Sequence, residues 1–592
     1  MEGWVASLGA GALRVFGGPS VQRAKSKDVE VVFDGRLANR RELAQSNATE
    51  DVTDAHIVLG AYRRHGERLL PRLRGAFALV IRDGREDLTL CARDPLGVHP
   101  LFTGTIGSEP VASASVEALL AHGVSGAVDP VALGDHLLHR WPDPAETPFA
   151  AVRRVPPGHA VRVSDGERRT WRYWDPLPAG HDPLWVTEAE LDAFDDLLER
   201  AVTAQIDGDG VGIFLSGGLD SVSVAAIAAV NARERGAPAP YALSLVFPEP
   251  DVDESKLQSS VARGLELPHV LLSWEDAVGA DGVVQEALDL SARLAAPLIN
   301  LWAPAYDRLA AEGARRGCSV VLTGGGGDEW LGVSPLYAAD LIRAGDVAGL
   351  YRLIAAQGRS HQVDRVRFLW NALWRFGARP LVGDVLARTA PAALSARHRR
   401  QAIASIPKWL APEASLRRAL VDRGTASRAD ATGGGHRFYL NAVRRSLDHA
   451  LVSVEMEEAF AQGGRTGVSI RAPYWDADLL EFLCRTPPEL LNRGGRAKGL
   501  VREAVARRFP ALGFERQRKV NSMRFAMSLF ASELPRAWSA LGGPRALAEA
   551  GIVDVRALHF SPSGVLTDVD QRLSMQTLWD ILNLEVWLRS HH

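Results

Sequence analysis

The sequence predicts an α/β protein built from two domains. The chain has 592 residues, which is more than one hydrophobic core ordinarily supports. Its first part carries strand patterns separated by Asp-Gly turns, and its second part alternates short apolar runs with helical segments. The first pattern is typical of antiparallel sheets, the second of a doubly wound parallel sheet. We place the boundary in the Pro-containing segment 174–185, which gives domains over 1–180 and 187–592.

Composition and charge exclude several classes of protein. With 46% hydrophobic and 23% charged residues the chain has the composition of a soluble globular protein. A net charge of −3 lacks the basic footprint of a nucleic-acid binder, so no nucleic-acid partner is expected. The cysteines Cys91, Cys318 and Cys484 lie far apart without a CxxC pair, which excludes a disulfide framework and a cysteine zinc site. There is no signal-peptide pattern and no apolar run of about 18 residues, so we expect a cytoplasmic protein without a membrane span.

Strand patterns dominate the first domain. The runs 29–37, 75–94 and 159–174 are rich in β-branched and apolar residues, and an Asp-Gly pair interrupts each of them. A helical pattern over 54–66 lies between the first two runs.

Helices and strands alternate in the second domain. We predict a helix over 187–206, a buried strand over 210–215, a helix over 221–233 and strands over 241–247 and 318–323.

A long arginine-rich helical segment follows, from about 335 to 460, with a Gly-containing loop predicted at 428–438. Its arginines between His361 and Arg428 suit an acidic peptide or a partner protein, although an ordinary solvated helix surface explains them equally well.

The motif "LSGGLDS", residues 215–221, joins the strand over 210–215 to the helix that follows. Such a loop aims backbone N–H groups and a helix N-terminus at an anion. The hydroxyls of Ser216 and Ser221 add donors, and Asp220 is suited to hold Mg²⁺ against phosphate oxygens. No Lys follows the glycines, so this is not a Walker A loop. A strand-to-helix turn with an Asp or Ser cap is the alternative, and the complete motif favours the phosphate site.

A second motif, "LTGGGGDEWLG", places four glycines between an apolar run and the carboxylates of Asp328 and Glu329. Each glycine fixed in a loop costs conformational entropy, so four in a row need a reason. One reason is a sharp turn, and the other is close approach of the backbone to phosphate and a metal ion.

Together these motifs resemble the nucleotide site of the asparagine synthetase class B family, whose members adenylate a carboxylate and release pyrophosphate. The resemblance implies that ATP and Mg²⁺ bind here, with Asp220 and Asp328 as metal ligands. It also implies that Lys498, in "AKGLVRE", contacts pyrophosphate as a catalytic cation, although a lone helical lysine is usually solvated. The ATP-binding residues implied are Phe214, Ser216, Gly217, Gly218, Asp220, Ser221, Thr323 and Gly324, of which Thr323 and Gly324 would line the adenine site.

The resemblance covers nearly the whole chain. "GAFALVIRDGREDLTLCARDPLGVHPLF" and neighbouring segments resemble an Ntn-type glutamine amidotransferase domain of αββα fold. The rest resembles an ATP-pyrophosphatase domain, an adenine nucleotide α-hydrolase-like parallel sheet with helical additions. The glutaminases use a cysteine directly after the initiator Met, where this chain has Glu2. Cys91 lies in a strand pattern typical of core. We therefore expect the first domain to be inactive and to release no ammonia.

Another departure concerns the acceptor side of the site. Asparagine-forming relatives carry a Glu three residues before the metal Asp, and β-lactam synthetases carry a Tyr nearby, but this chain has Gly325. The missing side chain leaves room for an acceptor bulkier than aspartate, although four glycines also suit a wide turn. Gly325, the length of the chain and the arginine-rich segment together favour the lasso peptide macrolactam cyclases as the members of the family that this sequence resembles most.

Such a cyclase adenylates an Asp or Glu side chain of a core peptide and joins it to the peptide's N-terminal amine, releasing AMP and pyrophosphate. The partners implied are a peptide substrate (the leader-bearing precursor or its core), a leader peptidase and a leader-recognition protein. The alternatives are a β-lactam synthetase-like ligase acting on a small amino-acid derivative, an asparagine synthetase-like amide ligase, and a non-catalytic scaffold.

Two further catalytic groups follow from the resemblance. A cation must stabilise the tetrahedral intermediate and the departing AMP, and "FERQRKVNS" offers Lys519, with Arg518 as its competitor. A base must accept a proton from the attacking amine. We assign that role to Glu457, within "VEMEEAF", with Glu455 and Glu458 as close competitors and a solvated helix face as the alternative.

Overall fold

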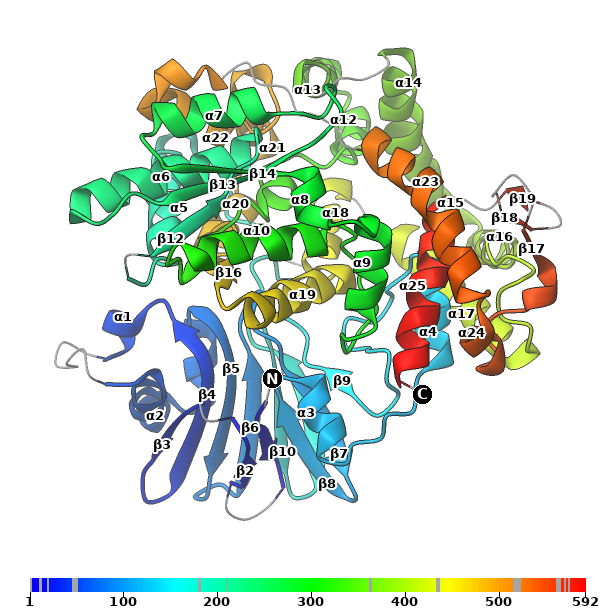
Figure 1. Ribbon diagram of the computed structural model, residues 1–592, viewed down its shortest axis with the longest axis horizontal. Helices are drawn as coiled ribbons and strands as arrows, with labels where there is room; N and C mark the ends of the chain where they lie inside the picture. Colours follow the sequence, from blue (N-terminus) through cyan, green and yellow to red (C-terminus); the bar gives the residue numbers. More distant parts are fainter. Residues whose placement is uncertain are drawn as a thin grey trace.

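The computed structural model describes most of the chain. The described ranges are 3–9, 13–18, 21–44, 52–178, 183–208, 210–360, 365–432, 437–514, 523–560, 566–568, 571–572 and 575–591. Figure 1 shows two stacked parts: strands in blue and cyan at one end, and a sheet wrapped by helices at the other. In the described residues, no helix is both long and apolar enough to cross a membrane.

The N-terminal part is a sandwich of two antiparallel sheets. One has the order β11-β10-β6-β5-β4-β3 and the other β2-β1-β8-β7-β9. The strands of the first sheet are β3 (Gln22–Lys25), β4 (Val29–Leu37), β5 (Gly75–Asp83), β6 (Leu88–Arg93), β10 (His159–Ser164) and β11 (Glu167–Arg172). Those of the second are β1 (Val5–Ser7), β2 (Val15–Phe16), β7 (Phe102–Ile106), β8 (Glu109–Ser113) and β9 (Arg153–Arg154).

Alternation of side chains along β4 to β6 explains the layers. Val32, Val80 and Cys91 face the second sheet and pack with Trp4 and Leu101 in one buried cluster. The alternate side chains of β4 to β6 point to the other face of the first sheet, where they pack under α2 (Asp54–His65). A further helix, α3 (Val116–Ala121), covers the second sheet through β8. The result is the expected α-β-β-α layering, and the predicted strands and the helix over 54–66 are confirmed.

The C-terminal part contains a five-stranded parallel sheet of order β14-β13-β12-β15-β16. Its strands are β12 (Val211–Phe214), β13 (Tyr241–Val246), β14 (His269–Ser273), β15 (Val320–Leu322) and β16 (Ser469–Arg471). The chain runs outward from β12 to β14, then returns to β15 and continues to β16 on the other side. Ligands of open parallel sheets bind at such a reversal point, beyond the carboxyl ends of the strands. Both glycine motifs follow the two strands at this point.

Helices cover both faces of this sheet. Ala242 and Ile213 pack with α6 (Leu219–Arg235) in one cluster, and Leu243 packs with α10 (Ala303–Arg315) in another. The remaining helices named below are α5 (Ala193–Thr203), α7 (Ser255–Gly264), α9 (Gly282–Ser291), α17 (Ala414–Thr432), α19 (Ala450–Thr466), α22 (Gly499–Arg508), α23 (Met523–Leu541) and α25 (Met575–His591).

The predictions for this part are mostly confirmed. Its three predicted strands and the helices over 187–206 and 221–233 are present, as β12, β13, β15, α5 and α6. Two edge strands, β14 and β16, were not predicted. The loop predicted at 428–438 is wrong in its first half, because α17 continues to Thr432. Its glycines at 433–435 lie outside the described residues.

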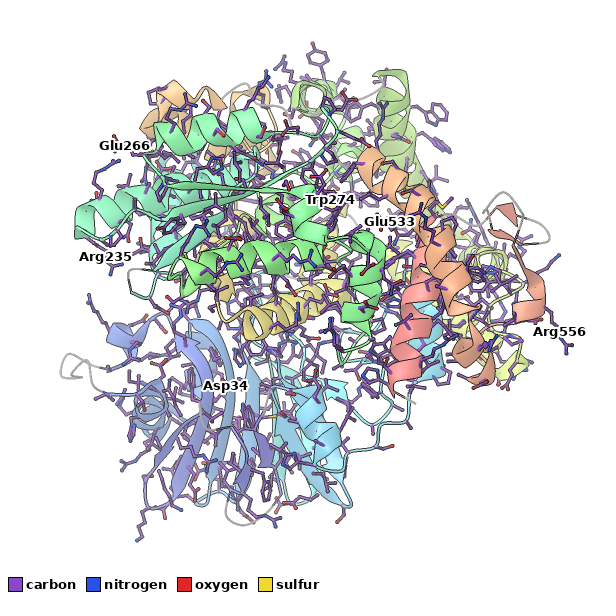
Figure 2. All side chains as sticks on the ribbon, viewed as in Figure 1. Asp34, Arg235, Glu266, Trp274, Glu533 and Arg556 are labelled. Atoms are coloured by element: carbon purple, nitrogen blue, oxygen red, sulfur yellow. The ribbon has the colours of Figure 1, made fainter. Side chains whose placement is uncertain are left out.

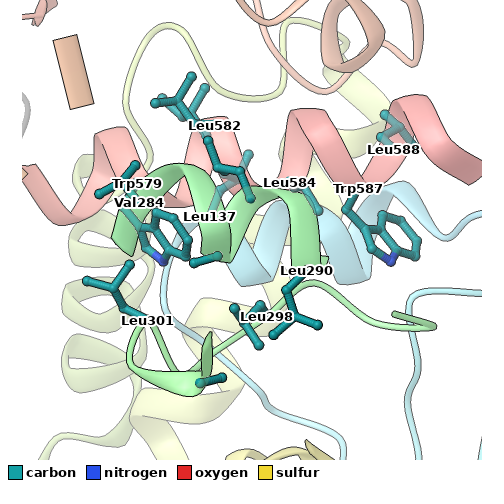
Figure 3. Packing of buried hydrophobic residues seen from close by; sticks show 14 of the residues in the cluster. Leu137, Val284, Leu290, Leu298, Leu301, Trp579, Leu582, Leu584, Trp587 and Leu588 are labelled. Carbon is teal, nitrogen blue, oxygen red and sulfur yellow. The ribbon is translucent and has the colours of Figure 1, made fainter. Parts of the chain in front are cut away.

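One hydrophobic cluster joins the two parts of the molecule. Trp579, Leu582 and Trp587 of α25 pack against α9 and against α4 (Pro130–Leu137), which precedes the domain boundary (Figure 3). The last helix of the chain therefore fastens the first domain to the second.

Candidate active site

The phosphate-loop motif lies at the carboxyl end of β12. The chain leaves the strand at Phe214 and enters α6 after Gly218. The Ser216 and Ser221 hydroxyls are 2.9 Å apart, and the Gly218 N–H donates to Ser216 Oγ at 3.1 Å. These bonds fix the loop with its backbone against the N-terminus of α6, where the helix dipole favours an anion.

The four glycines of the second motif have three different roles. A Cβ on Gly324 would lie 2.6 Å from the Ser221 nitrogen, and one on Gly327 would collide with the Asp220 carboxylate. These two glycines therefore let the second loop lie directly against the start of α6. Gly326 has a φ of 94°, a left-handed conformation that glycine adopts without strain.

Gly325 differs from the other three glycines. It is exposed and lines the large cavity beside the loops. Its φ is not positive, and its nearest neighbours are Thr323 Oγ1 at 3.2 Å and Ala472 Cβ at 3.8 Å. Gly324 and Gly327 thus allow a close approach to α6, whereas the approach to phosphate and metal predicted for the motif stays a prediction, and Gly325 borders the cavity beside Thr323 and Ala472.

Three predicted charged residues converge beside these loops. Lys498 Nζ donates to Asp328 Oδ1 at 2.8 Å and also to Asp220 Oδ2. Lys498 has a φ of 59° and directly precedes α22, and the Ala497 N–H is held by Ser360 Oγ at 2.8 Å. A lysine in a left-handed conformation is uncommon, which shows that the surrounding structure fixes its direction.

The donor set fits the predicted metal. Two carboxylates point at one positive charge, and carboxylate oxygens are the ligands that Mg²⁺ prefers. The Asp328 side chain is 53% exposed, so water can complete the coordination shell there. Asp220 and Asp328 are therefore the residues that would hold Mg²⁺ beside the phosphates of a nucleotide.

A cavity of about 1390 Å³ opens beside these residues. This exceeds the roughly 300–1,000 Å³ of an ordinary small-molecule site. Its walls include seven of the eight predicted ATP-binding residues, Gly217 being the exception, and also Asp328 and Lys498. The first domain contributes Gly35, Arg36, Arg40, Gly75, Pro95 and His99. One face of the helical segment around η3 (Asn371–Ala378) adds Phe368, Asn371, Ala372 and Phe376.

The predicted base Glu457 is directed away from this cavity. Its two carboxylate oxygens accept from Arg154 Nε at 2.6 Å and Nη2 at 2.8 Å, and Arg93 lies at 3.3 Å. Both arginines belong to the first domain and are almost fully buried. The structure corrects our assignment, because this carboxylate neutralises buried charge between the domains and is not brought to the nucleotide residues.

The two competitors of Glu457 have different surroundings. Glu458 accepts from the backbone N–H groups of Ile299 and Asn300, and burial raises its pKa to about 7. Glu329 follows Asp328, the predicted metal ligand, in the chain. Burial raises the pKa of Glu455, and the negative charge of Glu329 raises it further. None of the three glutamates lines the cavity, and the charge of Glu329 is what relates Glu455 to the second glycine motif.

Several predicted residues cannot be placed. Lys519, Arg518 and Glu2 lie outside the described residues, so their roles stay predictions. Cys91 is fully buried between the two sheets, and burial raises the pKa of its thiol to about 12. The prediction that Cys91 belongs to the core is confirmed.

Two residues of the site were missed. Glu254 accepts from the Gly217 N–H at 3.0 Å, and burial raises the pKa of its carboxyl. His99 of the first domain lines the cavity and stacks edge-on against Phe460, with ring centroids 4.7 Å apart. The acidic run that contains Glu254, directly after a predicted parallel strand, was a usable signal for the first, whereas only the folded interface reveals the second.

His99 belongs to a polar chain at the end of the first domain that faces the second. His99 Nε2 lies 3.2 Å from Asp34, which accepts from Trp4 Nε1 at 2.6 Å; Figure 2 labels Asp34 among the strands of the first domain. Burial alone would raise the pKa of Asp34, but the hydrogen bond and charge of His99 keep it below its ordinary value. These contacts among His99, Asp34 and Trp4 fix the part of the cavity wall that the first domain supplies.

Comparison with known proteins agrees with this architecture. The glutamine amidotransferase domain model matches residues 19–174, and the asparagine synthase model matches residues 193–589, more than half of the chain. "Asparagine synthetase [glutamine-hydrolyzing] 3" of Bacillus subtilis (strain 168) is 31% identical over 245 residues, 38% of each chain. The amidase chyE of Penicillium rubens is 28% identical over 54% of this chain and 50% of its own length.

A putative asparagine synthetase of Mycobacterium bovis is 29% identical over 52% of this chain and 48% of its own length. The matches therefore span half or less of these relatives. Among solved structures, the glutamine phosphoribosylpyrophosphate amidotransferase of B. subtilis covers 55% of this chain and 75% of its own at 14% identity. Its TM-score is 0.22, a likeness too weak to bear on fold or function. On the match of the asparagine synthase model, the chain belongs to the asparagine synthase family.

Proposed function

We propose that this protein is an ATP-dependent, AMP-forming ligase that closes a macrolactam ring in a peptide, as a lasso peptide cyclase does. It activates an Asp or Glu side chain of the peptide and joins it to the peptide's own N-terminal amine. The observation that carries the proposal is that Gly325 opens onto a cavity of about 1390 Å³. A site for aspartate or a small β-amino acid needs far less room.

The first step forms an acyl-adenylate. A carboxylate oxygen of the peptide attacks the α-phosphorus of ATP, and the bond to pyrophosphate breaks. The N-terminus of α6 and the Ser216 and Ser221 hydroxyls face the phosphates, and the Lys498 ammonium stabilises the charge of the departing pyrophosphate. Mg²⁺ held by Asp220 and Asp328 would neutralise phosphate charge when bound.

The second step forms the amide bond. The N-terminal amine attacks the acyl carbon, a base accepts a proton, and AMP leaves with one oxygen of the original carboxylate. We propose Glu455 as this base in place of Glu457, because burial and the negative charge of Glu329 raise its pKa and favour proton uptake, whereas Arg154 neutralises Glu457. Lys519 remains our candidate for the cation that stabilises the intermediate.

The first domain supplies structure and a cavity wall in this proposal. Its single cysteine, Cys91, is buried with a raised pKa and is unsuited to attack glutamine. An acceptor amine must then come from elsewhere, and the peptide's own N-terminus provides one. We propose a peptide substrate, a leader peptidase and a leader-recognition protein as partners.

The alternative with the best support is an asparagine synthetase-like amide ligase, because two of the relatives above carry that name. Free ammonia would then replace glutamine as the nitrogen source. This reading predicts that aspartate and ammonium support AMP formation without any peptide.

The test uses a leader-free candidate peptide, the full-length protein, ATP and Mg²⁺. Loss of one water from the peptide, measured by mass spectrometry, together with AMP would support the cyclase. AMP with aspartate and ammonium alone would move the assignment to the asparagine-forming reading. AMP with a small β-amino acid would move it to the β-lactam type, and no AMP with any acceptor, even with partner proteins present, would contradict an adenylating enzyme.

A further inference from the structure

The residue before Lys498 is held at both of its backbone polar groups. The Ala497 N–H donates to Ser360 Oγ at 2.8 Å, and the Ala497 carbonyl accepts from Arg502 Nε at 2.9 Å. Ser360, Ala497 and Arg502 are all buried, and all three line the cavity that Lys498 also borders. The mechanism above uses neither of the two side chains.

Ser360 holds this turn from the end of α13 (Val347–Ser360). Its hydroxyl donates to the Ala356 carbonyl of its own helix at 2.8 Å, so its oxygen remains as the acceptor for the Ala497 N–H. Two more bonds join this helix end to the residues before Ala497. Arg359 Nη1 donates to the Gly495 carbonyl at 3.2 Å, and Arg496 Nη1 donates to the Arg359 carbonyl at 2.7 Å. The end of α13 is thus a fixed support for the turn.

Arg502 holds the same turn from α22. Its backbone N–H donates to the Lys498 carbonyl at 3.1 Å, and its Nη1 donates to the Phe514 carbonyl at 2.9 Å. Burial lowers the pKa of Arg502, and the charge of Arg496 lowers it further, whereas the charge of Asp220 opposes both. A guanidinium in such a place is unfavourable unless its donors are used, and here they bind carbonyls of two separate segments.

Lys498 needs this support because its backbone conformation is unfavourable. Its φ of 59° brings a Cβ close to the following carbonyl oxygen. The contacts of its ammonium do not provide the support, since Asp220 and Asp328 are the carboxylates proposed to hold Mg²⁺. The direction of Lys498 is then set through its backbone, by the bonds on Ala497.

We propose that Ser360 and Arg502 are positioning residues, which hold Ala497 so that the Lys498 ammonium stays directed at the departing pyrophosphate. A cation held in place needs no rearrangement as charge develops on the leaving group, and it therefore stabilises that charge more than a mobile one. The inference rests on the ATP use proposed above. It gives the arginine-rich segment, to which α13 belongs, a part in the phosphate site.

The experiment measures binding of pyrophosphate and of AMP, each with Mg²⁺, by calorimetry on the full-length protein. Arg502→Met should weaken pyrophosphate about tenfold and leave AMP within twofold, because the lysine it positions is expected to contact pyrophosphate. In a Lys498→Met background the same change should weaken pyrophosphate less than twofold further, because its effect passes through Lys498.

Arg507→Met is the matched control and should leave both affinities unchanged. Arg507 lies on the same helix outside the cavity, and its side chain is 55% exposed and pairs with Asp195. Thermal unfolding shows whether each variant is folded. Ser360→Ala serves if Arg502→Met fails to fold, with an expected loss of about threefold in pyrophosphate affinity alone.

Equal weakening of pyrophosphate and AMP would assign Arg502 a merely structural role and overturn the inference while ATP use stands. A further tenfold loss in the Lys498→Met background would show that Arg502 acts independently of Lys498, and unchanged pyrophosphate affinity in Arg502→Met would show that it has no part in the site. A wild type that binds neither pyrophosphate nor AMP would refute the inference together with the proposed function.

Discussion

The two domains keep their folds but differ in what their buried polar groups do. At the carboxyl edge of the parallel sheet, Asp220, Asp328 and Lys498 converge on one point beside a cavity. In the first domain the only cysteine is buried between sheets. The buried Arg154 of the first domain donates two hydrogen bonds to the carboxylate of Glu457 in the second domain. Two domains of one chain thus differ in where they gather charged groups, and function must be argued from the site.

Side chains of the first domain also hydrogen-bond to the second domain across their interface. Arg74 donates to Asp478 at 2.6 Å, and Trp174 Nε1 donates to Glu481 at 2.7 Å. Together with the Arg154–Glu457 pair, these bonds hold the sandwich against the synthetase domain. The first domain therefore forms part of the cavity wall, and the predictions below test the roles proposed for the two domains.

The largest effect is expected at the metal and phosphate residues. Asp220→Ala removes a carboxylate that we propose holds Mg²⁺ beside the phosphates, and AMP formation should fall about a thousandfold. Asp192→Ala, at an exposed position without a side-chain cap bond, is the control and should be unaffected. Nucleotide products separated by chromatography give the readout. AMP formation within tenfold of wild type in Asp220→Ala would remove this residue from the mechanism.

A pair of glutamate variants separates catalysis from interface stability. Glu455→Gln should slow ring closure about a hundredfold without changing the melting temperature. Glu457→Gln leaves buried Arg154 poorly paired and should cost about 3 kcal/mol of stability, with turnover retained below the melting transition. Initial rates and thermal unfolding of both variants show which of the two glutamates acts in catalysis and which stabilises the interface. The opposite pattern would restore Glu457 as the base.

The open position at Gly325 should set the size of the acceptor. Gly325→Glu places a side chain into the cavity and should lower peptide turnover about tenfold, with the KM for ATP little changed. Gly325→Ala, whose Cβ would lie 3.2 Å from Thr323 Oγ1 and add little volume to the cavity, is the control. If the glutamate variant processes the peptide normally, the room at this position has no role in acceptor choice.

Glu458 gives a pH-dependent prediction. Its pKa is about 7 in the folded state against 4.5 ordinarily, so the folded protein holds a proton that the unfolded chain releases between these values. Stability from this group is present below pH 4.5 and is lost as the pH rises toward 7, by up to about 1.4 kcal/mol per pH unit. Urea unfolding at pH 5, 6 and 7 should show a shallower fall for Glu458→Gln. Parallel curves for both proteins would contradict a shifted pKa.

The smallest effect is expected at Cys91. Cys91→Ala should leave AMP formation and ring closure unchanged and cost about 1 kcal/mol of stability, because it removes only one buried atom of side chain. Loss of activity at a temperature where the variant is folded would show that the first domain retains thiol chemistry.

Much of this arrangement could be predicted from local sequence. The strands 29–37 and 241–247 and the phosphate loop carry patterns that local physics determines: alternation, apolar runs and a Gly-rich strand-to-helix turn. The convergence of Lys498 with Asp220, residues 278 positions apart, followed only from the family resemblance.

The rest depends on contacts between distant segments. Glu455, Glu457 and Glu458 occupy neighbouring positions of one helix, and their sequence offers no way to rank them. Only the fold shows that Arg154 donates a hydrogen bond to Glu457 and that the backbone N–H groups at 299–300 donate to Glu458. β16, a strand of three residues, is too short for any pattern, and its partner β15 is more than 140 residues away in the chain.

The most direct test of the central claim follows the oxygen atoms of the acceptor. The candidate peptide is labelled with ¹⁸O in its Asp or Glu side-chain carboxylate and incubated with the enzyme, ATP and Mg²⁺. If the synthetase domain forms an acyl-adenylate that the peptide's own amine attacks, each ring closed transfers one ¹⁸O to AMP, and mass spectrometry finds labelled AMP and a cyclic peptide in equal amounts. Cyclic peptide with unlabelled AMP, or labelled AMP that requires added ammonium, would contradict it.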